Sequence, residues 1–229
     1  MGVVSTSFRA RVRSSIETPV ARFFGRLGFS PNALTLIGFG IAAVGAGLAA
    51  TQNWLLAGLV VGFGAIFDLF DGALARATNK VSKFGAFMDS TFDRAGEAVV
   101  FVGIAWGLDV ARDIEGSTSG GGILALTALA ASLMVSYTRA KSDSLGFTAG
   151  TGMASIGLAP REIRVLILVI GLVVTGLAGG VGTMFWPNGA GSTAMFGSLI
   201  AITVLATITT IQRIYFVYQQ SKSTNQEDI

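Results

Sequence analysis

Four aspartates stand in otherwise apolar sequence: Asp68, Asp71, Asp89 and Asp93. Asp68 and Asp71 are three residues apart, and Asp89 and Asp93 are four apart, so each pair shares one face of a helix. An ionised aspartate at mid-bilayer costs about 2.5–3.5 kcal/mol, which argues that the four have a function. Two facing pairs would form an all-oxygen cage for one or two hard divalent cations. Such ions suit a substrate that carries a pyrophosphate.

The composition limits the other chemistry that is available. The sequence has no cysteine and no histidine, which excludes disulfides, cysteine-based zinc sites, thiol nucleophiles and Ser-His-Asp triads. Acid–base work must fall to carboxylates, lysines or tyrosines. The chain is 52% hydrophobic and 13% charged, whereas a soluble domain carries about 25% charged residues. We therefore expect an integral membrane protein that binds no nucleic acid.

Six apolar segments are each long enough for the roughly 20 residues that cross a bilayer. They predict an all-α membrane fold with transmembrane helices at 32–51, 54–76, 84–108, 121–143, 161–182 and 193–218. The sequence before them is basic, and Ser15 to Gly28 is typical of an amphipathic helix on the membrane surface. We divide the chain into a juxtamembrane segment at 1–30, a catalytic transmembrane domain at 31–219 and a polar disordered tail at 220–229.

The distribution of lysine and arginine predicts the orientation. With six spans both termini lie on one side, together with the loops at 77–83 and 144–160. Of the sixteen basic residues, Arg112 alone falls on the other side. The positive-inside rule then places both termini and the aspartates at the cytoplasmic face of the cell membrane.

Glycines accompany the aspartates. Gly72 follows Asp71 directly and leaves room for a phosphate beside the backbone. Gly85 lies one turn before Asp89 and would let two helices approach. Arg76 either donates to a phosphate or extends to the membrane interface. Elsewhere, the spacings Gly58-x3-Gly62 and Gly103-x3-Gly107 are typical of closely packed membrane helices.

These residues resemble the signature of a known family. The pattern Asp68-x2-Asp71-Gly72-x2-Ala75-Arg76-x8-Gly85-x3-Asp89-x3-Asp93 is similar to that of the CDP-alcohol phosphotransferases. The resemblance implies that the four aspartates bind the metal, expected to be two Mg²⁺ or Mn²⁺ ions, and that Asp93 is the general base. It also implies homodimers with a polar cavity open to the cytoplasm and to lipid.

The resemblance further implies a site for the CDP-lipid, a CDP-diacylglycerol or its ether-linked counterpart. Its residues would be Asn32, Thr35, Asp68, Gly72, Ala75, Arg76 and Gly85. For two of these residues a structural role is an equally good interpretation: Asn32 could be a helix N-cap, and Thr35 could be a buried hydroxyl. In the implied reaction the acceptor hydroxyl attacks the β-phosphorus, CMP leaves, and Asp93 accepts the proton.

A second polar cluster indicates the acceptor alcohol. Its order resembles the branch of the family that uses inositol phosphate, and its candidate residues are Ser136, Arg139, Lys141, Arg161 and Arg164. In that branch, the residues matching Ser136 and Arg161 help to hold the acceptor phosphate. The branch more often has Lys at 139 and Arg at 141, and the loop at 146–159 also differs. Glycerol phosphate, serine and free inositol therefore stay open, as does an ordinary positive edge of the membrane domain.

Two further points remain open at the level of sequence. Intramembrane acids could also belong to a cation transporter, but these acids cluster towards one membrane face beside glycines and Arg76, which favours an enzyme. Glu97 lies one turn beyond Asp93 and is either an acid that supports the metal ligands or a buried, protonated acid.

Overall fold

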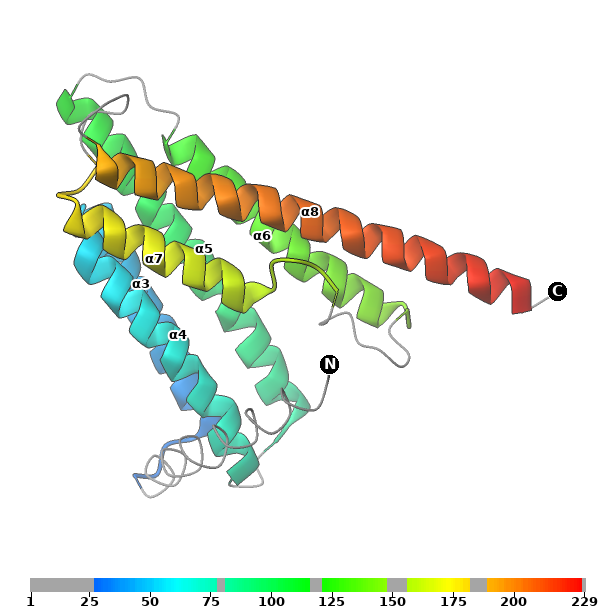
Figure 1. The fold of residues 1–229 in the computed structure, drawn as a ribbon. Helices are drawn as coiled ribbons and strands as arrows, with labels where there is room; N and C mark the ends of the chain where they lie inside the picture. The colour runs from blue at the N-terminus through cyan, green and yellow to red at the C-terminus, as the bar shows by residue number, and fades with distance from the viewer. Residues whose placement is uncertain (1–26, 78–80, 116–120, 148–155, 182–188, 228–229) are drawn as a thin grey trace, which may run out of the picture.

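The computed structural model describes residues 27–77, 81–115, 121–147, 156–181 and 189–227; within them, the side chains at 69, 71–73, 77, 110–115 and 223–227 are not described. The described residues form six helices, labelled as in Figure 1: α3 (Pro31–Ala50), α4 (Trp54–Ala77), α5 (Lys83–Glu115), α6 (Gly121–Ser144), α7 (Arg161–Leu177) and α8 (Ala190–Glu227). The expected surface helix at Ser15 to Gly28 lies almost wholly outside this part of the chain.

Local sequence signals set the starts of these helices. Pro31 occupies the first turn of α3, where its missing N–H costs nothing. The Ser30 side chain caps the same helix by accepting a hydrogen bond from the backbone N–H of Ala33 at 3.2 Å. Asn32 is therefore not the N-cap, and that interpretation of it was wrong. At α7, Pro160 is the N-cap residue itself and makes no side-chain cap bond, and Glu162 lies in the first turn, where a negative charge interacts favourably with the helix dipole.

The predicted helix bounds differ most from the structure at three ends. α5 continues to Glu115 rather than 108, because residues 108–115 contain no glycine or proline. α7 ends at Leu177 rather than 182, because Gly179 and Gly180 take φ of 88° and 95°, a left-handed conformation that ends a helix. α8 continues to Glu227 through the tail that was expected to be disordered, since residues 219–227 contain no glycine or proline.

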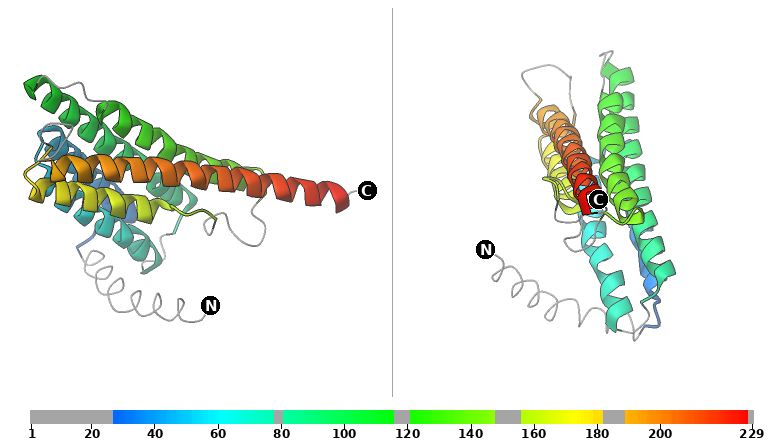
Figure 2. Two further views of the ribbon diagram at one scale, coloured as in Figure 1. Left: turned by 45° about the horizontal axis from the view of Figure 1, so that its top comes forward. Right: turned by 90° about the vertical axis from the view of Figure 1, so that its right-hand side faces the viewer.

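The six helices form a closed ring in which each packs against two others. Around the ring the order is α3, α4, α7, α8, α6 and α5, with α5 again beside α3. Figure 2 shows α7 and α8 on one side of the bundle and α5 and α6 on the other. α8 extends beyond the other helices towards the C-terminus (Figure 1).

Small residues bring the helices close together, as the glycine spacings predicted. A Cβ added at Gly103 would overlap the carbonyl oxygen of Ala46 on α3, and one at Gly107 would overlap that of Ala49. Gly58 brings α4 close to α7 in the same way: a Cβ added there would lie 2.8 Å from the side chain of Val173 on α7. A buried apolar cluster, including Phe101, Ile104, Leu108, Leu172, Met195 and Leu199, fills the centre.

Three of the described helices are long and apolar enough to cross a membrane by length and composition alone. They are Pro31–Ala50, Gly121–Ser144 and Ala190–Lys222, and Trp54–Asp68 is a shorter apolar helix. α5 and α7 do not meet this criterion: α5 carries Asp89, Asp93 and Glu97, and α7 has 17 residues. The outer surface of the bundle exposes many large apolar side chains, such as Phe63, Trp106 and Ile123, as expected of a bundle in contact with lipid.

Candidate active site

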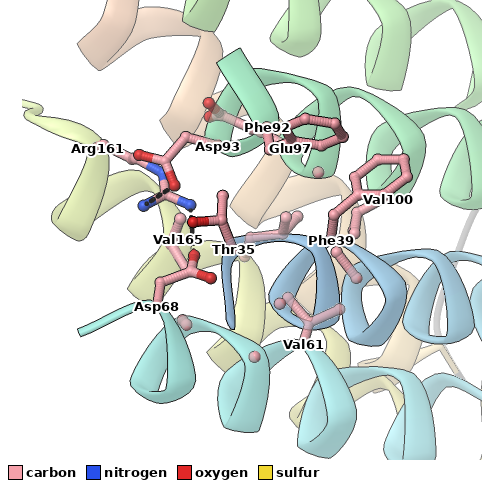
Figure 3. Close-up of a pocket in the computed structure, with 16 residues that line it drawn as sticks. Thr35, Phe39, Val61, Asp68, Phe92, Asp93, Glu97, Val100, Arg161 and Val165 are labelled. Carbon is pink, nitrogen blue, oxygen red and sulfur yellow. Dashed lines mark hydrogen bonds and ion pairs between the residues drawn. The ribbon is translucent and has the colours of Figure 1, made fainter. Parts of the chain in front are cut away.

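Side chains from three helices meet at the centre of the site. The Arg161 guanidinium at the start of α7 donates from Nη2 to Oδ2 of Asp68 on α4 at 2.9 Å. Its Nη1 lies 3.0 Å from Oδ1 of Asp93 on α5. Figure 3 shows the guanidinium between the two carboxylates, with Thr35 of α3 beside them. Asp68 and Arg161, which are 93 positions apart in sequence, are thus in direct contact.

The three side chains open onto a cavity of about 840 Å³ between α4 and α7. Asp89, Arg76 and Glu162 also belong to its polar part. Its remaining wall is apolar and includes Leu59, Phe63, Ile66 and Leu166, each more than half exposed on the outer surface of the bundle. A polar centre with an apolar wall that reaches the outer surface fits a lipid with a charged headgroup.

A second cavity, of about 270 Å³, brings together the residues expected at the nucleotide. It is lined by Asn32, Thr35, Ala75, Arg76, Gly85 and Asp89, among others. Arg76 and Asp89 line both cavities, so the two are neighbours. Thr35 is buried and donates from its hydroxyl to the Pro31 carbonyl at 3.3 Å.

Gly85 faces α3 in this second cavity. A Cβ at that position would lie 3.5 Å from Oδ1 of Asn32. Among the described residues, that Cβ would have one nearer neighbour, Oγ of Ser82 at 3.1 Å, and none on α4, so Gly85 does not bring the two aspartate-bearing helices together there. The sequence could not show this, since the contact depends on how α3 packs against α5.

The carboxylates fit a hard divalent cation in their chemistry. Asp68, Asp89 and Asp93 all line the 840 Å³ cavity, and carboxylate oxygens are preferred ligands of Mg²⁺ and Mn²⁺. Asp71 follows on the same helix as Asp68, but neither its side chain nor the space beside Gly72 is described. Among the described side chains, no three acidic groups lie close enough together to hold an ion as they stand, since the Arg161 guanidinium separates Asp68 from Asp93.

A buried ion pair gives Glu97 a role. Arg164 on α7 donates from Nε and Nη2 to the two carboxylate oxygens of Glu97 on α5, both at 3.2 Å. Its Nη1 donates to the Ala159 carbonyl at 3.0 Å. Arg164 is 1% exposed and lines neither cavity, so the structure does not bring it to Arg161 and the aspartates as an acceptor residue. Its ion pair with Glu97 instead links α7 to α5 inside the bundle.

The other residues expected at the acceptor lie on α6. Ser136 is partly buried, Lys141 is exposed, and Nε of Arg139 lies 3.9 Å from Oδ2 of Asp143 on the surface. Neither of the two cavities includes these three side chains. The structure therefore brings Arg161 to the aspartates but leaves this part of the expected acceptor cluster on α6, outside both cavities.

Arg213 on α8 is a buried cation that was not among the predicted site residues. It is 3% exposed and donates from Nε to the Ile156 carbonyl at 3.0 Å and from Nη1 to the Val135 carbonyl on α6. Arg139 and Arg164 lie near enough for their positive charges to repel that of Arg213. It is the sole charged residue between Ala190 and Ser221, a signal that could have found it.

Comparison with known proteins agrees with this geometry. The chain belongs to the CDP-alcohol phosphatidyltransferase family, whose family model matches residues 29–217. It is thus a multi-pass membrane enzyme of phospholipid synthesis, and the alternative of a cation transporter was wrong.

Individual relatives are similar over nearly their whole length. The archaetidylinositol phosphate synthase of Pyrococcus horikoshii is 36% identical over 209 residues, which cover 90% of this chain and 94% of that protein. The phosphatidylinositol phosphate synthase of Mycobacterium tuberculosis is similar in structure. With CDP-DAG bound it gives a TM-score of 0.72 at 30% identity, covering 89% of this chain and 94% of that one. In complex with manganese and citrate, the mycobacterial enzyme gives a TM-score of 0.73 at 29% identity, and the match covers 89% of each chain.

Proposed function

We propose that this enzyme transfers a phosphatidyl-type group from a CDP-lipid to inositol phosphate and releases CMP. The observation that carries the proposal is the meeting of Asp68, Asp93 and Arg161 in a cavity with an apolar wall. Carboxylates suit metal ions on a pyrophosphate, and an arginine beside them suits a second, anionic substrate. The names of the relatives support the acceptor, since they are an archaetidylinositol phosphate synthase and a phosphatidylinositol phosphate synthase.

The two cavities divide the CDP-lipid between them in this proposal. The nucleotide occupies the smaller cavity beside Asn32, Thr35, Ala75 and Gly85, with Gly72 close to a phosphate. Arg76 and Asp89 line both cavities and so meet the pyrophosphate. The lipid chains follow the apolar wall between α4 and α7.

Asp68, Asp71, Asp89 and Asp93 would hold the divalent cations, which we propose are two Mg²⁺ or Mn²⁺ ions. The manganese in the mycobacterial relative supports this choice. When bound, the ions supply positive charge that stabilises the pyrophosphate as its bond to CMP breaks.

Asp93 acts as the general base. Its carboxylate accepts the proton of the acceptor hydroxyl, whose oxygen forms a bond to the β-phosphorus. The bond between that phosphorus and the CMP oxygen breaks, and CMP leaves with the electron pair. A single in-line displacement predicts inversion at phosphorus.

Arg161 binds the acceptor phosphate, and Ser136, Arg139 and Lys141, which lie on α6 outside the two cavities, are assigned to the acceptor on the family resemblance alone. A phosphate needs such cations, whereas serine or free inositol does not. Glycerol phosphate shares the anionic group, so it is the strongest competing acceptor.

The membrane arrangement completes the proposal. The six helices α3 to α8 each span the bilayer, with residues 1–30 on its cytoplasmic surface and 31–219 forming the catalytic domain. Both termini and the active site face the cytoplasm of the cell, as the distribution of lysine and arginine supports. The enzyme forms a homodimer.

An acceptor panel tests the proposed function. Purified enzyme is supplied with labelled CDP-diacylglycerol, Mg²⁺ and either inositol phosphate, inositol, glycerol phosphate or serine. Labelled lipid product should form fastest with inositol phosphate. Faster transfer to glycerol phosphate or to a neutral alcohol would reject this acceptor while leaving the transferase reaction intact.

A further inference from the structure

Two arginines on α7, one turn apart, differ in how fully their nitrogens are used. All three side-chain nitrogens of Arg164 have partners, and the residue is 1% exposed. The Arg161 side chain is 32% exposed and uses Nη1 and Nη2 for Asp93 and Asp68. Its Nε is buried and, within the described part of the chain, has no hydrogen-bond acceptor. Arg161 is therefore held less completely than Arg164.

The oxygens that Arg161 holds are those that would bind a metal ion. The guanidinium approaches Oδ2 of Asp68 and Oδ1 of Asp93 within 3.0 Å. A divalent cation on the same oxygens would stand a few ångströms from the guanidinium, and like charges at that separation repel strongly in a low-dielectric site. The guanidinium and the ion cannot both occupy the space between these carboxylates.

We propose that the Arg161 guanidinium and the catalytic metal compete for Asp68 and Asp93, so that metal binding releases Arg161 to bind the acceptor phosphate. The second half of this inference depends on the proposed function. Arg161 thereby couples the two ligands: the metal strengthens acceptor binding, and the acceptor strengthens metal binding by the same factor.

The surroundings of Arg161 allow its side chain to leave while α7 stays in place. Arg164 fixes the helix through Glu97 and through the Ala159 carbonyl, independently of Asp68 and Asp93. Arg161 lines the 840 Å³ cavity, so open space adjoins it. A planar guanidinium released there can offer two parallel donors to a phosphate.

Metal binding in the absence of acceptor tests the competition. Mn²⁺ is titrated calorimetrically into metal-depleted enzyme in detergent. Arg161→Ala should bind Mn²⁺ about tenfold more tightly than wild type, or better, because a competing charge-assisted contact is lost. Arg161→Gln, which keeps a polar chain, should behave alike if the alanine variant does not fold. An unchanged or weaker affinity for Mn²⁺ in the folded variant would overturn the proposal.

Arg94→Ala is the matched control. Arg94 also lies near Asp93, with Nη1 at 3.9 Å from Oδ2, but that nitrogen donates to the Ser90 carbonyl, and among the described side chains Arg94 makes no ion pair with Asp68. Its removal tests the general effect of deleting a nearby positive charge. An increase in Mn²⁺ affinity as large as that of Arg161→Ala would show a general electrostatic effect and would overturn the competition.

A second titration with inositol phosphate present tests the release. Wild type should bind Mn²⁺ more tightly when inositol phosphate is added, and Arg161→Ala should lose this response. If the acceptor panel gives no product from inositol phosphate, the proposed function fails while the first titration still decides the competition. If product forms but inositol phosphate does not change wild-type affinity for Mn²⁺, the release is wrong.

Discussion

Glu97 and Arg164 form a buried ion pair one helical turn further along α5 and α7 than the contact between Asp93 and Arg161. The same two helices are thus joined twice, once deep in the bundle and once at the cavity. The deeper pair is fully enclosed, whereas the pair at the cavity is partly exposed. This arrangement separates a contact that fixes the helices from one that can take part in the reaction.

Replacing one member of the buried pair should destabilise the enzyme. Arg164→Ala or Glu97→Ala leaves one charge unpaired in the bundle, which typically costs about 3–5 kcal/mol. The double variant Glu97→Leu with Arg164→Met should recover much of this stability, because two apolar side chains can fill the space. Thermal unfolding in detergent measures the difference. Single and double variants with equal melting temperatures would contradict the buried pair.

A methyl group at Gly103 should disturb the packing of α5 on α3. Gly103→Ala would push against the Ala46 carbonyl oxygen, which belongs to the backbone and cannot rotate away, and overpacking of this kind costs about 1–3 kcal/mol. Gly47→Ala is the control, because nothing lies within 4 Å of the Cβ it would add. Only the first variant should lower the melting temperature, and equal effects would refute the close approach.

Removing a metal ligand should abolish turnover. Asp68→Ala or Asp89→Ala deletes a carboxylate that lines the cavity and would bind the ions beside the pyrophosphate. Mn²⁺ binding should weaken in parallel with activity, and EDTA should inactivate the unmodified enzyme. Full activity in EDTA would contradict a metal-dependent reaction.

Substitution of the acceptor residues should raise the KM for the acceptor more than the KM for the CDP-lipid. Arg161→Ala removes a charge-assisted contact to phosphate and should raise the acceptor KM by about 10–150-fold. Ser136→Ala removes a neutral donor and should have a smaller effect of the same kind. The measurement varies inositol phosphate at fixed CDP-lipid. An unchanged acceptor KM in Arg161→Ala would argue for a neutral acceptor.

The positions of the helices could be predicted from the sequence because the signals are local. Apolar length, Pro31 and Pro160 locate the segments, and the spacing of the aspartates places each pair on one helix face. The ends of α5 and α8 were misjudged for the same reason: polar residues without glycine or proline can continue a helix, and polarity alone does not end it.

Contacts between distant helices could not be predicted in this way. Arg161 and Arg164 looked alike in sequence, as two cations near a membrane edge, but one turn of helix directs the first to Asp68 and buries the second against Glu97. The pairing of Gly85 with Asn32 and the burial of Arg213 likewise depend on how the ring of helices closes.

Asp93→Asn gives the most direct test of the proposed reaction. The amide keeps the shape of the side chain but cannot accept the hydroxyl proton, and a general base contributes about 10²–10⁴-fold to a rate. CMP and lipid product are measured together from CDP-diacylglycerol and inositol phosphate at saturating metal. Wild type should form them in equal amounts, and Asp93→Asn should form neither at a comparable rate while still binding CDP-lipid. Release of CMP without lipid product by wild type, or near-normal turnover by Asp93→Asn, would contradict the account.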